Sequence, residues 1–238
     1  MDEPRSRVSA AGFWETLYAE RQDGWELGEA APSLQACLAP DGSFAPGARV
    51  AVPGCGRGHD ARLLARHGCA VTGFDFAEAA VTEARQLASR ERLSVDFERR
   101  DVFTLAKDYA GGFDAVWEYT CFCAIDPDRR AEYARTLHDI LKPGGTLLAC
   151  FYPLKDGTDG PPFPVSRPGI EAALGPLFDI VEAGPPPASR APRRLIHPCG
   201  RARVGHFFRD GLGAPARRFT AKGGTSMKVF RIVLVLLL

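Results

Sequence analysis

The stretch VAVPGCGRGHD, residues 50–60, runs from a short apolar segment directly into glycine at every second position. Glycines this dense at the end of a strand-like run indicate that something approaches the backbone closely. The residues that follow, His59 and Asp60, stand where a phosphate-binding P-loop has Lys and Ser or Thr. The spacing G-x-G-x-G also differs from the G-x-G-x-x-G fingerprint of dinucleotide-binding proteins. The stretch therefore argues against a nucleoside triphosphatase.

Around this stretch the chain alternates between strand-like and helix-like segments. The predicted strands are residues 48–52, 70–74, 94–100, 113–117, 146–152 and 178–184. The predicted helices are residues 13–21, 32–38, 60–68, 77–90 and 128–141. The sequence LKPGG, residues 141–145, is expected to be a turn into the fifth strand. Regular alternation of this kind predicts an α/β fold with a doubly wound, mostly parallel sheet.

Length and composition set the class of protein. With 238 residues, 45% of them hydrophobic and 25% charged, the chain is expected to form one domain. A net charge of +1 without a long basic run argues against a nucleic-acid partner. No secretory signal is evident, and the apolar end VLVLLL is too short for a membrane span. Seven cysteines without a C-x-x-C pair favour reduced thiols, so we expect a cytoplasmic protein. We also expect a monomer.

Several residues follow the predicted strands, at the edge where doubly wound sheets bind ligands. Gly54 follows the first strand, and Asp75 ends the second, where an acid typically accepts hydrogen bonds from ribose hydroxyls. Asp101 and Val102 end the third strand, where a carboxylate meets an adenine amino group and an apolar side chain packs on the ring. Tyr119 follows the fourth, where an aromatic face lies near a cation. These positions suit a ligand with a ribose, an adenine and a cation, and the sequence has no phosphate-binding motif. S-adenosylmethionine fits this description, and the glycines leave room for it.

Simpler explanations stay open for some of these side chains. Trp14, Tyr18 and Trp25 fit the apolar face of a helix as well as they fit a cofactor site. Tyr119, taken by itself, fits core packing better than contact with a cation. Cys121 and Cys123 fit buried thiols better than metal ligands. The HPC sequence at residues 197–199 has no partner pair, so we expect no metal site.

Taken as a set, the motifs resemble a known family. FWETLYAERQDGWELGEAAPSL, VPGCGRGHD, GFDFAEAAV, DVF, EYTCFCAIDPDRRAEYA, LKPGGTLL and GPPFPVS cover roughly residues 13–194. In these motifs the sequence resembles class I S-adenosylmethionine-dependent methyltransferases of the thiopurine S-methyltransferase family. Its nearest resemblance is to the halide and thiol (thiocyanate) methyltransferases. The resemblance implies a Rossmann-like sheet with an N-terminal helical cap, about residues 9–40.

The resemblance also implies the cofactor and the residues that bind it. The cofactor is S-adenosyl-L-methionine, and the implied contacts are Trp14, Tyr18, Trp25, Gly54, Asp75, Asp101, Val102 and Tyr119. Tyr18 stands where the plant branch more often has tryptophan. The match fails near the C-terminus, so we expect a methyltransferase domain at residues 1–210 and a divergent extension at 211–238. RVGHFF, residues 203–208, is a candidate last strand, and the apolar end is expected to form an extra strand or a partner surface.

The expected reaction is methyl transfer to a small-molecule acceptor that is a soft nucleophile, namely a thiol, thiocyanate or halide. Such a nucleophile needs little help from a base, so we predict no catalytic residue. An aromatic N-terminal lid, with CFC (121–123) and GPPFPVS (160–166) on the acceptor side, would exclude water. The alternatives are thiopurine, metalloid or small O-acceptor methylation, or a cofactor-binding protein without activity.

Overall fold

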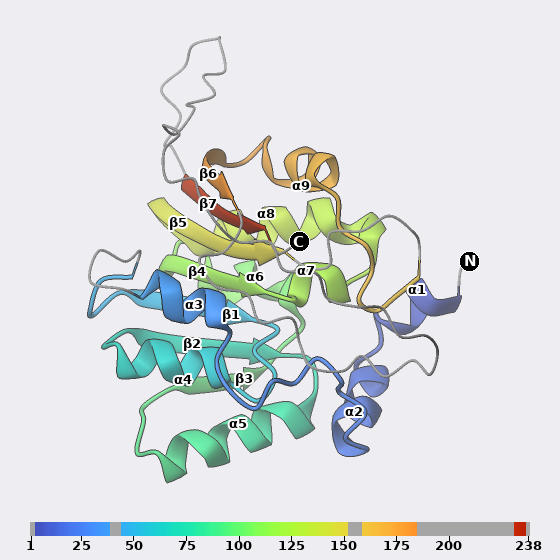
Figure 1. The fold of residues 1–238 in the computed structure, drawn as a ribbon, viewed down its shortest axis with the longest axis vertical. Helices are drawn as coiled ribbons and strands as arrows, with labels where there is room; N and C mark the ends of the chain where they lie inside the picture. Colours follow the sequence, from blue (N-terminus) through green and yellow to red (C-terminus); the bar gives the residue numbers. More distant parts are fainter. Residues whose placement is uncertain (1–2, 39–43, 152–158, 185–230, 237–238) are drawn as a thin grey trace, which may run out of the picture.

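The computed structural model describes residues 3–38, 44–151, 159–184 and 231–236. Within these residues, seven strands form one sheet (Figure 1) in the order β3-β2-β1-β4-β5-β7-β6, and every strand pairing is parallel. The strands are β1 (Arg49–Pro53), β2 (Ala70–Asp75), β3 (Asp96–Arg99), β4 (Phe113–Tyr119), β5 (Leu141–Phe151), β6 (Asp179–Gly184) and β7 (Arg231–Leu236). The prediction of a doubly wound, mostly parallel sheet is therefore confirmed.

Helices cover both faces of the sheet (Figure 1). The α-helices are α1 (Glu3–Arg7), α2 (Ala11–Ala19), α3 (Pro32–Cys37), α4 (His59–Arg66), α5 (Glu78–Arg90), α6 (Ala106–Tyr109), α7 (Cys121–Ala124), α8 (Arg130–Ile140) and α9 (Arg167–Leu174). Two short 3₁₀ turns, η1 (Val102–Thr104) and η2 (Pro127–Arg129), complete the described elements. Helices α3, α4 and α5 pack on one face, and α8 and α9 on the other.

Strands β1 and β4, in the middle of the sheet, are largely buried on both sides, because helices cover both faces. In β1, Val50 and Val52 pack with α4 and α5, whereas Ala51 between them packs with α8. Burial of a side chain such as valine or leucine contributes about 1.5–3 kcal/mol relative to exposure. The two clusters on either side of the sheet therefore stabilise the fold.

The sheet order places a switch point between β1 and β4. The chain runs from β1 outward through β2 to β3, and then returns to form β4 on the other side of β1. The connections after β1 and β4 consequently diverge to opposite faces and leave a crevice at the carboxyl ends of the strands. The loop at residues 54–58 and the turn into α7 border this crevice.

The structure corrects one predicted boundary. Strand β5 begins at Leu141, so it includes the LKPGG sequence that was expected to be a turn. The pairing with β4 shifts from Phe113↔Leu141 to Ala115↔Thr146, so the residues between Leu141 and Thr146 bulge out of the ladder. Gly144 has a φ of +82° within this bulge, a backbone conformation that favours glycine. A turn-like sequence is thus accommodated inside a continuous strand.

The C-terminal segment contributes a strand to the sheet. Strand β7 lies between β5 and β6 and pairs with both, so the apolar end forms an extra strand, one of the two roles expected for it. The candidate strand at 203–208 lies outside the described residues, as does most of the expected extension. The domain boundary at residue 210 therefore stays a prediction.

Candidate cofactor site

The glycine loop, defined here as Gly54–Gly58, connects β1 to α4. Gly54, Gly56 and Gly58 all have positive φ, with values of +61°, +52° and +71°. A Cβ on Gly58 would lie 2.5 Å from Cζ of Phe97, and one on Gly54 would lie 2.9 Å from Cβ of Cys121. The close approach that the glycine spacing predicted is therefore made partly by the protein's own side chains, which pack directly on the loop.

Asp75 lies at the carboxyl end of β2 and is only 6% exposed. Its Oδ2 accepts a hydrogen bond from the backbone N–H of Gly56 at 2.8 Å, and Oδ1 accepts one from Ala77 N–H at 3.0 Å. Burial raises the pKa of this carboxyl above its usual range, while the backbone N–H donors partly oppose that shift. The carboxylate is thus held in one orientation beside the glycine loop.

Asp101 and Val102 follow β3, as the sequence predicted. Oδ1 of Asp101 accepts a hydrogen bond from the backbone N–H of Phe103 at 3.0 Å, which caps the η1 turn. Val102 is buried in the core cluster that includes α8. The turn fixes both side chains at the same edge of the sheet as Asp75.

The three predicted aromatic residues of the N-terminal region form one cluster. Trp14 and Tyr18 come from α2, and Trp25 comes from the segment that follows it. The Trp25 ring centroid lies 5.7 Å from each of the other two rings, in edge-to-face geometry. Nε1 of Trp25 donates a hydrogen bond to the Tyr18 hydroxyl at 3.4 Å. Burial raises the pKa of Tyr18 well above its usual range, so this phenol is neutral.

Tyr119 ends β4 and borders the switch point from the other side. Its ring stacks on Trp117 with centroids 6.3 Å apart and an interplanar angle of 18°. Nε1 of Trp117 in turn donates a hydrogen bond to Asp60 at 2.7 Å, which ties β4 to the start of α4. The next residue, Thr120, has a φ of +65°, a strained conformation for a β-branched side chain. Strain of this kind at the crevice was not foreseen from the sequence.

All eight predicted contact residues line one cavity of about 570 Å³ at the switch point. They are Trp14, Tyr18, Trp25, Gly54, Asp75, Asp101, Val102 and Tyr119. Ligand-binding cavities in proteins typically measure about 300–1,000 Å³, so this volume suits a nucleoside-sized ligand together with a small second molecule. The structure thus brings together residues that are far apart in the sequence.

The segments expected on the acceptor side also reach this cavity. Cys121 and Cys123 line it from α7, and Gly160, Pro161 and Pro162 line it from the segment before α9. Burial raises the pKa of both thiols, so both are uncharged at neutral pH. Phe122 between them instead packs in the core.

Glu118 was missed by the sequence analysis although it lies next to Tyr119. Its side chain is fully buried, and Oε1 accepts a hydrogen bond from the backbone N–H of Phe122 at 2.7 Å. Burial raises the pKa of Glu118 to about 7, against the backbone N–H donors of α7 that favour its charged form. The available signal was an acid inside the otherwise apolar end of the strand FDAVWEY.

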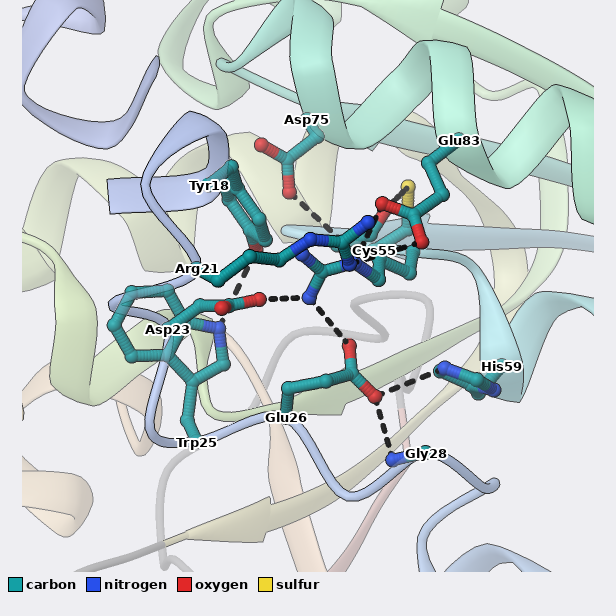
Figure 2. A network of polar contacts seen from close by, with 12 residues as sticks. Tyr18, Arg21, Asp23, Trp25, Glu26, Gly28, Cys55, His59, Asp75 and Glu83 are labelled. Atoms are coloured by element: carbon teal, nitrogen blue, oxygen red, sulfur yellow. Dashed lines mark hydrogen bonds and ion pairs between the residues drawn. The ribbon is translucent and has the colours of Figure 1, made fainter. Parts of the chain in front are cut away.

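Arg57, in the middle of the glycine loop, was also missed. Its guanidinium group is buried and contacts the carboxylates of Asp23, Glu26 and Glu83, the network drawn in Figure 2. Hydrogen bonds and charge from Arg57 and Arg21 lower the pKa of Glu83, despite the opposing effect of its burial. The sequence shows an arginine between two glycines but not which acids it meets.

Two kinds of feature are absent from the described part of the chain. No group of three or more His, Cys, Asp or Glu residues is arranged there to hold a metal ion. None of its helices is both long enough and apolar enough to cross a membrane.

The strand order, the glycine loop and the acids after β2 and β3 define a Rossmann-like S-adenosylmethionine-dependent methyltransferase. A solved structure of Burkholderia thailandensis 1,6-didemethyltoxoflavin-N1-methyltransferase shares this fold, with a TM-score of 0.58 and 23% identity. The alignment covers 71% of this chain and 76% of that one.

The family model described as thiopurine S-methyltransferase (TPMT) matches residues 9–189, so the chain belongs to that family. It is 34% identical over 168 residues to thiocyanate methyltransferase 1 of Arabidopsis thaliana, covering 70% of this chain and 72% of the relative. It is 31% identical over 207 residues to probable thiol methyltransferase 2 of the same plant, covering 86% of this chain and 90% of that relative. The protein is therefore an enzyme that uses S-adenosylmethionine as its methyl donor.

Proposed function

We propose that this enzyme methylates a small soft nucleophile, namely a thiol, thiocyanate or halide. We also propose that the eight residues predicted from the sequence bind the cofactor. The names of the two plant relatives, a thiocyanate and a probable thiol methyltransferase, support this choice of acceptor. The meeting of all eight residues in one cavity supports the cofactor site.

In this proposal each side chain holds a different part of the cofactor. The Asp75 carboxylate accepts hydrogen bonds from the ribose hydroxyls, Asp101 accepts one from the adenine amino group, and Val102 packs on the adenine ring. The rings of Tyr119, Trp14, Tyr18 and Trp25 face the positive charge, which aromatic faces attract. The bound cofactor supplies a methyl group on a sulfonium, ready for in-line attack.

The main support for a thiol, thiocyanate or halide acceptor is that the described cavity lining lacks the usual basic side chains. Among the described residues that line the cavity there is no histidine, lysine or glutamate. Its three carboxylates, Asp75, Asp101 and Asp126, each accept a hydrogen bond from a backbone N–H. An acceptor that must lose a proton during attack would therefore find no imidazole or amine in the described lining, only carboxylates already engaged by backbone N–H groups. A thiolate, thiocyanate or halide arrives already able to attack.

The rest of the lining suits an anion that must shed water. Most lining residues are apolar or aromatic, and a dry cavity strengthens the attack of an anion. The only cations among the described lining residues are Arg7 and Arg129. Arg129 lies 3.4 Å from the Phe103 ring centroid and is held by two hydrogen bonds to Glu132, so its position is defined. These arginines offset part of the negative charge of the three carboxylates in the same lining.

The test is formation of S-adenosylhomocysteine by the purified protein across a panel of acceptors. The panel contains an alkyl thiol, thiocyanate, iodide, a thiopurine and a catechol, each at several concentrations. The highest kcat/KM is expected for a thiol, thiocyanate or iodide. A preference for the thiopurine or the catechol would overturn the acceptor class, and cofactor binding without turnover on any acceptor would indicate a binding protein.

We further propose that the enzyme acts as a monomer in the cytoplasm. Cys55, Cys69, Cys121, Cys123 and Cys150 are free thiols, which fits a reducing compartment. Light scattering during size-exclusion chromatography tests the monomer. A mass that corresponds to a dimer would contradict it.

A further inference from the structure

Arg57 is the only charged residue of the glycine loop, and its side chain is just 4% exposed. A buried guanidinium group requires paired charges, and three carboxylates supply them. Nε donates to Oε2 of Glu83 at 2.7 Å, and Nη1 donates to Oδ2 of Asp23 and, at 3.5 Å, to Oε2 of Glu26. Asp23 is itself 5% exposed, so this ion pair is shielded from solvent.

The carboxylates belong to two separate parts of the chain (Figure 2). Glu83 lies on α5, which is packed against the sheet. Asp23 and Glu26 lie on the cover segment, defined here as residues 22–28, which follows α2. Trp25 stands between these two acids in the cover segment. The contacts of Arg57 therefore fasten an aromatic part of the proposed cofactor site to the sheet.

A second set of contacts fastens the cover segment beside Arg57. Oε1 of Glu26 accepts a hydrogen bond from the backbone N–H of Gly28 at 2.7 Å, and it lies 2.9 Å from Nε2 of His59 (Figure 2). Nδ1 of His59 lies 2.9 Å from the guanidinium of Arg62, a group that only donates. Nδ1 of His59 is therefore the acceptor, and the Nε2–H donates to Glu26. Helix α4 thus holds the same acid that contacts Arg57.

Arg57 also joins the cover segment to the site itself. Its guanidinium carbon lies 5.5 Å from the Tyr18 ring centroid, and the Tyr18 hydroxyl accepts the hydrogen bond from Trp25. The preceding residue, Gly56, donates its backbone N–H to Asp75. One short loop therefore contacts the proposed ribose acceptor on one side and the aromatic cover on the other.

We propose that Arg57 is a positioning residue, which holds the cover segment closed over the cofactor and so sets cofactor affinity and release. The inference rests on the proposed cofactor site. Trp14, Tyr18 and Trp25 line the same cavity as Gly54 and Asp75, so displacement of the cover segment opens the wall formed by Trp25. Uptake and release of the cofactor are then coupled to separation of Arg57 from Asp23 and Glu26. Motions of this type often limit turnover in enzymes.

The test uses two variants of the full chain and one matched control. Arg57→Gln removes the positive charge. Asp23→Asn weakens the ion pair with Arg57, while Arg57 keeps its contacts with Glu26 and Glu83. The control is Arg21→Gln, because Arg21 also contacts Glu83, at 3.2 Å, but its side chain is 67% exposed. Hydrogen–deuterium exchange over residues 20–30 is measured without cofactor, and affinity and dissociation rate are measured with S-adenosylmethionine.

Both site variants are expected to exchange faster over residues 22–28 and to bind S-adenosylmethionine about tenfold more weakly, mainly through faster release. The value of kcat at saturating cofactor should change less than KM, and Arg21→Gln should match wild type. Should Arg57→Gln fail to fold, Asp23→Asn decides. Unchanged exchange, or faster exchange with unchanged affinity, would overturn the role of Arg57. The proposed cofactor site would instead be overturned if the wild type failed to bind S-adenosylmethionine, or if Asp75→Ala bound it with full affinity. The exchange data would still test whether Arg57 holds the cover segment in place.

Discussion

The backbone N–H of Gly56 donates a hydrogen bond to Oδ2 of Asp75, with an N···O distance of 2.8 Å. This bond joins the loop after β1 to the end of β2, two neighbouring strands of the sheet. It also means that the loop presents its backbone to the same carboxylate that we assign to the ribose. Changes at Asp75 and at the glycines should therefore have separable effects on binding and on folding.

Replacement of Asp75 by alanine is expected to weaken S-adenosylmethionine binding by about 1.5–3 kcal/mol, roughly 10- to 150-fold, because the ribose hydroxyls lose a charged acceptor. Asp75→Asn keeps an acceptor for Gly56 N–H and should weaken binding less. Titration calorimetry measures both. Asp96→Ala is the control, since Asp96 is exposed at the opposite end of the neighbouring strand β3. Wild-type affinity in Asp75→Ala would exclude the proposed site.

Gly58→Ala is expected to destabilise the protein by about 1–3 kcal/mol, since overpacking adds to backbone strain. The new Cβ would meet the Phe97 ring at 2.5 Å, and the residue has a φ of +71°. Thermal unfolding should show a melting temperature lower by several degrees. Gly12→Ala, in α2 with open space around it, should be neutral or slightly stabilising. Equal melting temperatures for the two variants would contradict the loop geometry.

Glu118→Gln is expected to change how stability depends on pH. Burial raises the pKa of Glu118 from 4.5 to about 7 on folding, so its favourable contribution is fully present below pH 4.5. That contribution is lost as the pH rises through about 7, where the buried group must ionise. Relative to wild type, Glu118→Gln should therefore gain up to about 3 kcal/mol of stability between these pH values.

Urea unfolding at a series of pH values measures this difference. Glu132→Gln is the matched control, because a hydrogen bond from Arg129 lowers the pKa of Glu132. The contribution of Glu132 to stability changes below pH 4.5, and not between pH 4.5 and about 7, where that of Glu118 changes. Parallel curves for wild type and Glu118→Gln from pH 4.5 to 8 would show that Glu118 does not titrate as proposed.

A chain that ends at residue 230 should lose stability and aggregate. Strand β7 pairs with β5 from Thr146 to Phe151 and also pairs with β6, so its loss leaves two unpaired strand edges. Soluble yield and melting temperature are the measurements. A chain that ends at residue 236 keeps β7 and serves as the control. Equal yields and melting temperatures would show that β7 adds nothing to the sheet.

The dependence of rate on pH should differ between acceptors if the enzyme supplies no base. The rate with an alkyl thiol should rise toward the pKa of the thiol, about 8.5, because only the thiolate attacks. The rate with iodide or thiocyanate should be nearly flat from pH 6 to 9, since neither has a proton to lose. Tyr119→Phe should lower both rates modestly without changing either profile.

Single-turnover methylation of a thiol and of iodide, followed by analysis of the volatile product, measures these profiles. A bell-shaped profile shared by both acceptors would mean that a group of the enzyme titrates in the transition state. The preformed-anion mechanism would then be wrong.

The positions of the central strands and of the site residues were predictable from the sequence. Strand β1 is a short apolar run that leads directly into Gly54, and β2 and β4 end at Asp75 and Tyr119. Parallel strands bring such ends to one edge. This is why Gly54, Asp75, Asp101, Val102 and Tyr119 line one cavity, whereas Trp14, Tyr18 and Trp25 were implied by the family resemblance alone. Their contact with the cofactor stays a prediction, as does the N-terminal cap.

The sequence alone determined the sheet class, the glycine loop and the acids at the strand ends, because local pattern and chain direction specify these. Only the tertiary structure decided what Arg57 meets, since its partner Asp23 lies 34 residues away and faces it through packing of α2 and α5. The same holds for Glu118, whose pKa depends on burial by other elements, and for β7, whose neighbours β5 and β6 come from distant parts of the chain. Local sequence carries a residue's chemistry, but its charge partners and solvent exposure arise from contacts between segments that only folding brings together.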